Sequence, residues 1–431
     1  MSVISELVDS VPIPRMALIA QKFQDPCIAD LGEAVKSAFE KENEKISWPE
    51  GGEIAVIVGS RGIARIDEVT KHVVENLKSK GFSPFIVPGM GSHGGATGPG
   101  QKEVLESLGV TEEKMGVPIR ASMEVVQVGE LPNGLPVYID HYAYAADGIV
   151  LINRVKPHTA FRGKYESGIV KMMAIGVGKQ KGAESCHKLG FGKMAEHIVQ
   201  IADVVMKTGK ILCGVAIVEN AYDHVQRIEV LPTSEIFARE PALLELAKAS
   251  MPRILVDDID VLIVDEIGKD ISGDGMDPNI TGRYPTPYAT GGPNVTKIVV
   301  LGLTERTHGN ANGLGVADTA TKRVLDMVDF DKTYPNALTS TVMTPVKMPM
   351  ILDTDKRAVQ AAIKTCNILR DEDARVVHIR TTLAMNYIRV SESLLPLLSQ
   401  RDDVTILSEP EDFPFDTAGR FDHASCWQKT K

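Results

Sequence analysis

Cysteine is scarce in this sequence, and its distribution excludes one class of fold. The 431 residues contain five cysteines, at positions 27, 186, 213, 366 and 426. Their number is odd and no two form a CxxC pair, so a disulfide-stapled scaffold is excluded and a thiolate zinc or iron–sulfur site is not expected. We expect a disulfide-free protein of a reducing compartment.

Long apolar runs and an excess of positive charge are also lacking. No apolar stretch approaches the roughly 20 residues of a membrane-spanning helix, and residues 1–10 show no basic start followed by an apolar core, the pattern of a signal peptide. Acidic residues outnumber basic ones by 57 to 47, and the net charge is −10, so no nucleic-acid footprint is expected. These absences predict a cytoplasmic protein that binds neither nucleic acid nor membranes.

The chain has the length and composition of a two-domain globular protein, with 43% hydrophobic and 24% charged residues. Residues 54–58 and 84–88 are apolar strands separated by a helical pattern, and a second unit of this kind opens at residues 261–264. Strands that alternate with helices are typical of parallel sheets. The sequence predicts an α/β fold with two α/β domains (residues 1–252 and 253–431), mainly parallel sheets and an interdomain active-site cleft.

Charged and imidazole side chains follow the ends of several predicted parallel strands. These residues are Arg61, His93, His158, Lys269 and His308. In open α/β sheets the ligand crevice lies along the carboxyl ends of the strands, so residues distant in sequence can converge there. Loops after strands are polar in most proteins, which is the ordinary explanation for any one of the five. Because three of them are histidines, among only ten in the chain, we favour convergence.

Residues 89–98 form a glycine-rich loop around His93. The loop is neither a P-loop nor the GxGxxG turn of a dinucleotide fold, and a plain tight turn would explain the glycines. Glycines also let backbone amides approach an anion, and a histidine at this position gains nothing for packing. Its imidazole suits general acid–base chemistry near neutral pH.

Lys171 lies among apolar residues, and His187 follows sixteen positions later beside Cys186. A lysine in such a segment can simply extend its amine to the surface. A desolvated lysine with a lowered pKa is instead available for covalent attachment. His187 or Cys186 could bind a soft metal, although neither alone is a specific signal.

Taken in order, these motifs resemble the nickel-pincer-nucleotide lactate racemase family. The matching features are Arg61, the His93 loop, Pro157-His158, Ser167-Gly168 with Lys171, His187, and Gly268-Lys269-Asp270. The resemblance extends over roughly residues 54–270. It implies an isomerase that racemises or epimerises a 2-hydroxy acid, by proton-coupled hydride transfer to a nickel-pincer nucleotide (pyridinium-3,5-bisthiocarboxylic acid mononucleotide nickel).

The resemblance also implies a role for each residue. Lys171 would carry the cofactor covalently and His187 would bind its nickel. His93 and His158 would be the acid–base pair, and Arg61 and Lys269 would hold the substrate carboxylate. The expected partners are the 2-hydroxy-acid substrate and the enzymes that make the cofactor, and a homodimer is compatible with the sequence.

The chain departs from the family pattern in two places. The first loop reads Gly59-Ser60-Arg61-Gly62 in place of an Asp and a Thr-Arg-Pro, and the spacer between His158 and Lys171 is longer than expected. Lys164 is therefore a rival attachment site, ranked second because it lacks the Ser-Gly frame. These changes indicate a divergent member that acts on a substrate other than lactate.

Two other functions remain open at this point. In one, His93, His158 and His187 bind a metal that activates water for hydrolysis. In the other, the chain is a non-catalytic module that binds an anion in its basic pocket. A cofactor-sized adduct on Lys171 would separate the racemase hypothesis from both.

Overall fold

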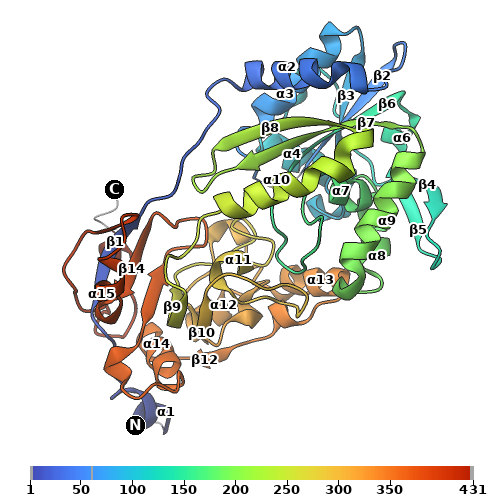
Figure 1. The fold of residues 1–431 in the computed structure, drawn as a ribbon. Helices are drawn as coiled ribbons and strands as arrows, with labels where there is room; N and C mark the ends of the chain where they lie inside the picture. The colour runs from blue at the N-terminus through green and yellow to red at the C-terminus, as the bar shows by residue number, and fades with distance from the viewer. Residues whose placement is uncertain (1–2, 60–61, 428–431) are drawn as a thin grey trace. The chain divides into compact units, whose positions relative to one another are not determined.

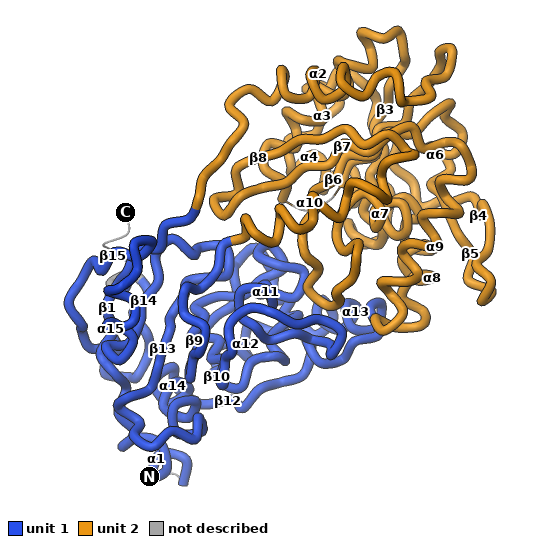
Figure 2. Tube along the Cα trace, in the orientation of Figure 1, with its two compact units in different colours: residues 1–23, 252–431 blue, residues 24–251 orange. Residues whose placement is uncertain are grey.

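The computed structural model describes residues 3–59 and 62–427 (Figure 1). The chain folds into two compact units (Figure 2). Unit 2 is Gln24–Met251, and unit 1 joins the chain up to Phe23 with everything from Pro252 onward. The sequence assigns residues 1–252 to one domain, whereas the contacts place the first 23 residues in the other unit. The reason is that strand β1 (Met16–Gln21) pairs with β14 (Tyr387–Ser391) and β15 (Val404–Ile406).

Unit 2 is built on a five-stranded sheet in the order β3-β2-β6-β7-β8. The strands are β2 (Glu53–Val58), β3 (Ser83–Pro88), β6 (Gly148–Arg154), β7 (Ile211–Glu219) and β8 (Val225–Pro232). All neighbours are parallel except β7 and β8. The parallel strands are almost entirely buried, as expected for apolar strands covered on both faces. Together with unit 1, this sheet confirms the predicted α/β class with mainly parallel sheets.

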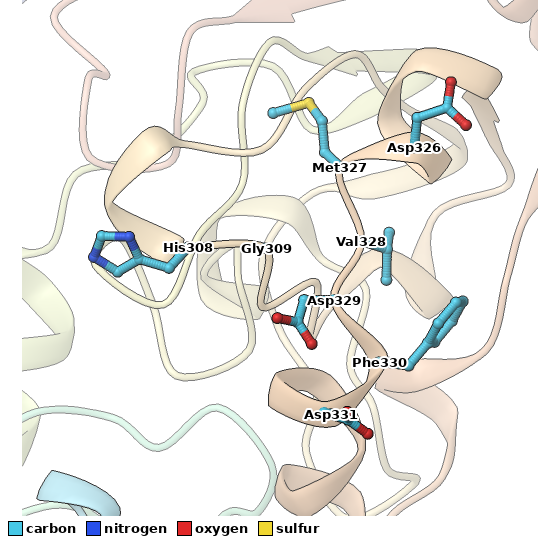
Figure 3. A pocket seen from close by; sticks show the side chains of 8 residues that line it. All are labelled: His308, Gly309, Asp326, Met327, Val328, Asp329, Phe330 and Asp331. Carbon is cyan, nitrogen blue, oxygen red and sulfur yellow. The ribbon is translucent and has the colours of Figure 1, made fainter.

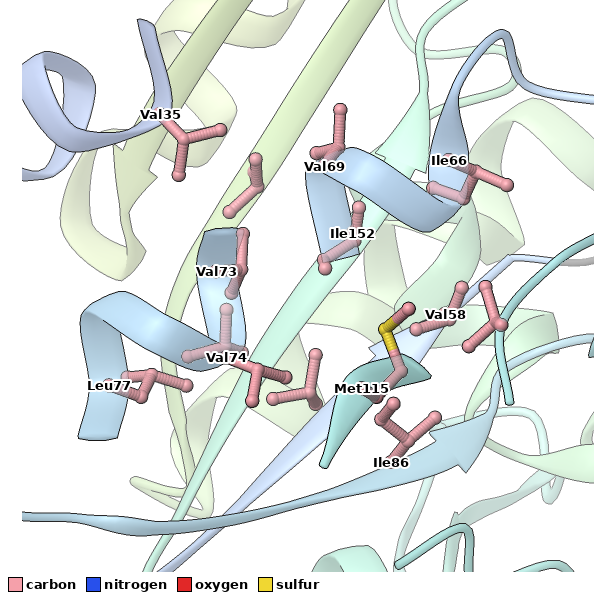
Figure 4. Close-up of a cluster of buried hydrophobic side chains, with 14 of the residues drawn as sticks. Val35, Val58, Ile66, Val69, Val73, Val74, Leu77, Ile86, Met115 and Ile152 are labelled. Carbon is pink, nitrogen blue, oxygen red and sulfur yellow. The ribbon is translucent and has the colours of Figure 1, made fainter. Parts of the chain in front are cut away.

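Helices cover this sheet, and the packing of α3 shows why the sequence folds this way. Its apolar residues recur at helical spacing, and Val69, Val73, Val74 and Leu77 are fully buried against the strands (Figure 4). Each such side chain contributes roughly 1.5–3 kcal/mol through burial. The unit's helices are α2 (Leu31–Glu42), α3 (Ile66–Ser79), α4 (Gly98–Ser107), α5 (Glu112–Met115), α6 (His141–Ala145), α7 (Ile169–Lys171), α8 (Lys179–His187), α9 (Met194–Lys207) and α10 (Ile236–Ser250). A separate hairpin consists of β4 (Val125–Glu130) and β5 (Pro136–Asp140).

Unit 1 contains an eight-stranded sheet in the order β12-β11-β10-β9-β13-β14-β1-β15. Strands β9 (Asp258–Val264), β10 (Asn294–Val300), β11 (Thr319–Thr321), β12 (Met350–Leu352) and β13 (Val376–Ile379) are parallel, and the last three in the order are antiparallel. The helices are α1 (Val3–Val8), α11 (Pro278–Thr281), α12 (Lys322–Asp326), α13 (Phe330–Ser340), α14 (Asp355–Lys364), α15 (Leu395–Leu398) and α16 (His423–Cys426). In the described ranges, no helix combines the length and apolar character needed to cross a bilayer.

Candidate active site

Four of the six predicted site residues lie in unit 2. These are His93, His158, Lys171 and His187. Lys269 belongs to unit 1, and Arg61 lies outside the described residues. The site is therefore built below from the four residues of unit 2.

The His93 loop begins where β3 ends, and it packs against the segment that follows Lys171. A Cβ on Gly176 would lie 2.7 Å from the carbonyl oxygen of Gly89, and a Cβ on Gly89 would lie 3.0 Å from the Met172 side chain. Only glycine permits backbones to approach this closely. The glycines of this loop thus serve, at least in part, to bring the His93 segment and the Lys171 segment together.

A buried polar network lies beneath the His93 loop. The fully buried Lys179 amine donates hydrogen bonds to the carbonyl oxygen of Pro88 (2.5 Å) and to Oε1 of Gln101 (3.0 Å), and lies 3.5 Å from the Asp140 carboxylate. Gln101 in turn donates from Nε2 to the carbonyl oxygens of Gly91 (2.8 Å) and His93 (3.3 Å). Burial lowers the pKa of Lys179 and raises that of Asp140, and their mutual attraction opposes both shifts. This network fixes the backbone that carries His93.

Another buried carboxylate organises the His158 loop. Glu166, whose side chain is fully buried, accepts hydrogen bonds from the amide of His158 (2.7 Å) and from Arg162 (3.3 Å), and Lys248 lies 3.2 Å from its other oxygen. The amide of Ala160 donates to Nδ1 of His158 at 3.0 Å. Because Nδ1 accepts, the proton of the neutral ring resides on Nε2. The loop therefore selects one tautomer of His158.

Lys171 ends a short helix whose start is capped by a carboxylate from α10. Glu240 accepts hydrogen bonds from the amides of Ile169 (2.8 Å) and Val170 (3.0 Å). Burial raises the pKa of Glu240 to about 7, although these two amides favour its charged form. A Cβ on Gly168 would lie 2.5 Å from Glu240, which explains the glycine of the Ser-Gly frame. A π-helical turn, Met172–Gly176, follows directly, a feature frequent at functional sites.

The surroundings of His187 favour its neutral form. Its Nδ1 lies 2.8 Å from the carbonyl oxygen of Ala183, which can only accept, so the proton is on Nδ1 and Nε2 presents its lone pair. Burial lowers the pKa of His187 to about 4; the hydrogen bond to Ala183 opposes this shift, and the charge of Lys171 adds to it. Metal ligation requires the neutral imidazole, oriented through its other nitrogen.

An aromatic side chain that the sequence did not single out joins two of the histidines. The ring centroid of Phe191 lies 5.4 Å from that of His187 and 6.0 Å from that of His158. Phe161 packs on His158 at 4.4 Å. The only sequence signal for Phe191 was its position four residues after His187. The only signal for Phe161 was its position in the loop that follows Pro157-His158.

These contacts bring three of the predicted residues into one group. His158 and His187 share the Phe191 ring, and the charge of Lys171 acts on the pKa of His187 and of the adjacent buried Cys186. The His93 loop packs on the π-helical turn that follows Lys171. Lys164, the rival attachment site, is exposed, with its amine 5.6 Å from the ring of its neighbour Tyr165.

Lys269 and His308, the two residues of unit 1 among the five that follow predicted strands, have surroundings of their own. The Lys269 amine donates to the carbonyl oxygen of Gly273 at 2.7 Å, within its own loop. His308 is exposed and lines a surface hollow with Gly309 and residues 326–331 (Figure 3). The hollow includes three carboxylates, Asp326, Asp329 and Asp331, so it is no basic pocket for an anionic substrate.

The histidine-bound metal of the hydrolase hypothesis finds no support in this geometry. In the part of the chain that is described, a single set of three side chains places its donor atoms close enough to share an ion: Asp25, Cys27 and His224. Among the described residues, His93, His158 and His187 do not form such a set.

Comparison with known proteins bears on the segment that carries this group. Residues 17–198 match the family described as the lactate racemase N-terminal domain, and this range contains His93, His158, Lys171 and His187. A solved structure of the lactate racemase apoprotein from Thermoanaerobacterium thermosaccharolyticum is 13% identical, with a TM-score of 0.48 over 84% of this chain and 94% of that one. A Thermotoga maritima structure is 15% identical, with a TM-score of 0.46 over 65% of this chain and 71% of that one. No curated protein matches the chain.

Proposed function

We propose that this chain, which belongs to the lactate racemase-like family through residues 17–198, racemises or epimerises a 2-hydroxy acid. The observation that supports the proposal most lies inside the matched segment: His158 and His187 share the Phe191 ring, and the charge of Lys171 acts on His187. Such a group combines an amine for attachment, a neutral imidazole for a metal and a second imidazole for proton transfer.

The donor chemistry of this group fits a nickel-pincer nucleotide. The Lys171 amine would form the covalent link, and Nε2 of His187, neutral and oriented by Ala183, would bind the nickel. When bound, this cofactor supplies a site that accepts a hydride from the substrate and returns it. Glu240 holds the helix of Lys171 in place through two amides, so the amine projects from a fixed backbone.

His158 and His93 are suited to move the hydroxyl proton of the substrate. The neutral His158 ring holds its proton on Nε2, and its loop is fixed by Glu166. His93 is held on a separate loop by the Lys179–Gln101 network. Two imidazoles on different loops can approach the two faces of a carbon centre, one as base and the other as acid. In our proposal each histidine deprotonates one enantiomer.

The cation roles of Arg61 and Lys269 stay predictions. A 2-hydroxy acid needs its carboxylate held during inversion, because the planar ketone would otherwise leave the site before its opposite face receives the hydride. An arginine binds a carboxylate through two parallel hydrogen bonds. Replacement of Arg61 by lysine should therefore weaken substrate binding while leaving cofactor loading unchanged.

The decisive experiment is to produce the protein together with cofactor-making enzymes and to map its modification. We expect a nucleotide-sized mass increase on the peptide that contains Lys171, one nickel per loaded chain, and inversion of at least one compound in a panel of chiral 2-hydroxy acids. Lys171→Ala should abolish the adduct. Lys164→Ala is the matched control and should keep it.

Two results would contradict the proposal. An adduct that persists in Lys171→Ala and disappears in Lys164→Ala would move the attachment site. A loaded protein that shows no inversion, together with His93→Ala and His158→Ala variants altered only in anion affinity, would favour the non-catalytic binding module.

A further inference from the structure

The segment after residue 23 is fastened to the turn between β7 and β8. The buried Asn220 donates from Nδ2 to the Asp25 carboxylate (2.6 Å) and to the carbonyl oxygen of Pro26 (3.0 Å). The amide of Ile28 donates to the carbonyl oxygen of Val225 at 2.8 Å. Two of these hydrogen bonds fix the backbone on either side of Cys27, and the third holds the Asp25 carboxylate.

The same asparagine shapes the turn that presents His224. Its Oδ1 accepts hydrogen bonds from the amides of Tyr222 (2.8 Å) and His224 (3.1 Å), and its own amide donates to the carbonyl oxygen of His224 at 2.9 Å. The Tyr222 ring stacks beside that of His224, with centroids 6.3 Å apart. Nδ1 of His224 lies 2.7 Å from Oδ1 of Asp25. Asn220 therefore sets the positions of two side chains at once.

Cys27 completes a set of three different donors. The ligand atoms of Asp25, Cys27 and His224 all lie within 4.8 Å of one another. Cys27 is the exposed cysteine of this chain, and the other four are buried. Donor atoms around a tetrahedral zinc ion lie about 3.3–3.8 Å apart, given bond lengths of about 2.0–2.3 Å. Because Asp25, Cys27 and His224 are exposed, small rotations of their side chains would bring the donor atoms from these separations to the distances that zinc requires.

We propose that Asp25, Cys27 and His224 bind a divalent transition-metal ion of the zinc class, with a fourth position open to water. Thiolate and imidazole donors select zinc over magnesium or calcium, which prefer oxygen. Binding takes the proton from the Cys27 thiol into solvent and uses the imidazole in its neutral form. The site shares no residue with the group around Lys171, and it ties the start of unit 2 to the β7–β8 turn.

The ordinary alternative is a surface carboxylate–histidine pair with a thiol nearby. The chain contains a matched example of such a pair: Nδ1 of His72 lies 3.1 Å from Glu75 on α3. His72 is therefore the control residue. The two histidines differ in that the pair at His224 has a thiol beside it and an asparagine that orients the carboxylate.

The test uses the full chain, produced without cofactor-making enzymes, treated with a chelator and titrated with zinc in competition with a chromophoric chelator. We expect one tight zinc per chain, unaffected by excess magnesium, and a thiolate-to-cobalt charge-transfer band when Co²⁺ replaces zinc. Cys27→Ser and His224→Ala should lose the tight site and the band, whereas His72→Ala should keep both. Asn220→Ala should weaken zinc binding about 10- to 100-fold, as outer-shell changes do.

Zinc affinity that is equal in Cys27→Ser and in the unaltered chain would overturn the proposal. Loss of the tight site in His187→Ala, with His224→Ala unaffected, would also overturn it and assign the zinc to the group around Lys171. Because Asp25, Cys27 and His224 are exposed, their variants should unfold at the same temperature as the parent without zinc. That measurement separates lost ligation from lost folding.

Discussion

Two histidines, one in each unit, are held by different partners. His187 in unit 2 is oriented by a carbonyl oxygen and faces the positive charge of Lys171. His378 in unit 1 is fully buried, 2.5 Å from the Asp265 carboxylate, and its ring is surrounded by Phe413, Phe421 and Trp427.

The difference distinguishes a histidine with a ring nitrogen available for binding from a structural histidine. A histidine held by a carboxylate and enclosed by rings has its hydrogen-bonding capacity satisfied from within the protein. A neutral histidine held by one carbonyl keeps a lone pair for a metal or substrate. Burial alone would have ranked His378 as the better site candidate. The nature of the partner decides between them.

The largest expected effect comes from breaking the unit 1 pair. Asp265 also accepts from Nε1 of Trp427 at 2.7 Å, so Asp265→Ala removes the carboxylate that two buried donors bind. Loss of one member of a buried pair costs about 3–5 kcal/mol. Trp427 and Trp48 are the chain's two tryptophans, one in each unit, so urea unfolding of unit 1 can be followed by Trp427 fluorescence in a Trp48→Phe background. A loss below about 1 kcal/mol would contradict the structural role.

The same pair predicts the behaviour in acid. Burial opposes ionisation of Asp265, but its interactions with His378 and His423 outweigh burial and hold its pKa well below its usual range. Its contribution is therefore present above the unfolded pKa of about 3.9 and is lost as the pH falls through the folded value. Asp265→Asn should lower the unfolding free energy of unit 1 near neutral pH, and this free energy should then depend less on pH in acid. An acid midpoint unchanged by Asp265→Asn would count against this account.

A smaller effect is expected from removing the ring between the unit 2 histidines. Phe191→Ala should cost about 3 kcal/mol, because large-to-small changes at buried aromatic positions leave a cavity. It should also admit water to His187, so its pKa should rise from about 4 toward the usual 6.5. Proton NMR of the imidazole measures this shift. Phe330→Ala, at an exposed ring, is the control and should change neither value.

Glu240→Gln should alter the pH dependence of unit 2. The folded pKa of about 7 exceeds the unfolded value of about 4.3, so the folded state holds an extra proton between these values and stability falls as the pH rises through this window. The glutamine keeps an acceptor for the two amides but cannot ionise. The fall in unfolding free energy between pH 4.5 and 7 should therefore be about 1–3 kcal/mol smaller in the variant than in the parent. Urea unfolding followed by Trp48 in a Trp427→Phe background provides the test; an unchanged slope would sink the assignment.

The smallest effect is expected at His308, whose ring is exposed. His308→Ala should change unfolding free energy by less than about 0.5 kcal/mol, as surface substitutions do. It should also leave inversion of any 2-hydroxy acid unchanged. A loss of activity in this variant, with unfolding unaffected, would place His308 in the site and revise the comparison between the units.

Local patterns predicted most of the strands and helices of the parallel sheets. The match is close for β2 (Glu53–Val58) and β3 (Ser83–Pro88), which the sequence predicts as residues 54–58 and 84–88. The prediction failed where pairing is nonlocal. Strand β1 joins unit 1 through partners more than 360 residues away, and no local pattern carries that information. Near the end of the chain, the Trp427 ring donates to Asp265, 162 residues away, a contact that no local pattern predicts either.

The sequence by itself determined the α/β class, the order of the motifs and the residue types available for chemistry, because period and spacing are local properties of the chain. Tertiary structure alone decided that Phe191 stands between His158 and His187, that Glu240 caps the Lys171 helix, and that Asp25 meets His224. Except for the contact between His187 and Phe191, they join segments far apart in sequence, and they arise only when burial of the sheet brings the segments together.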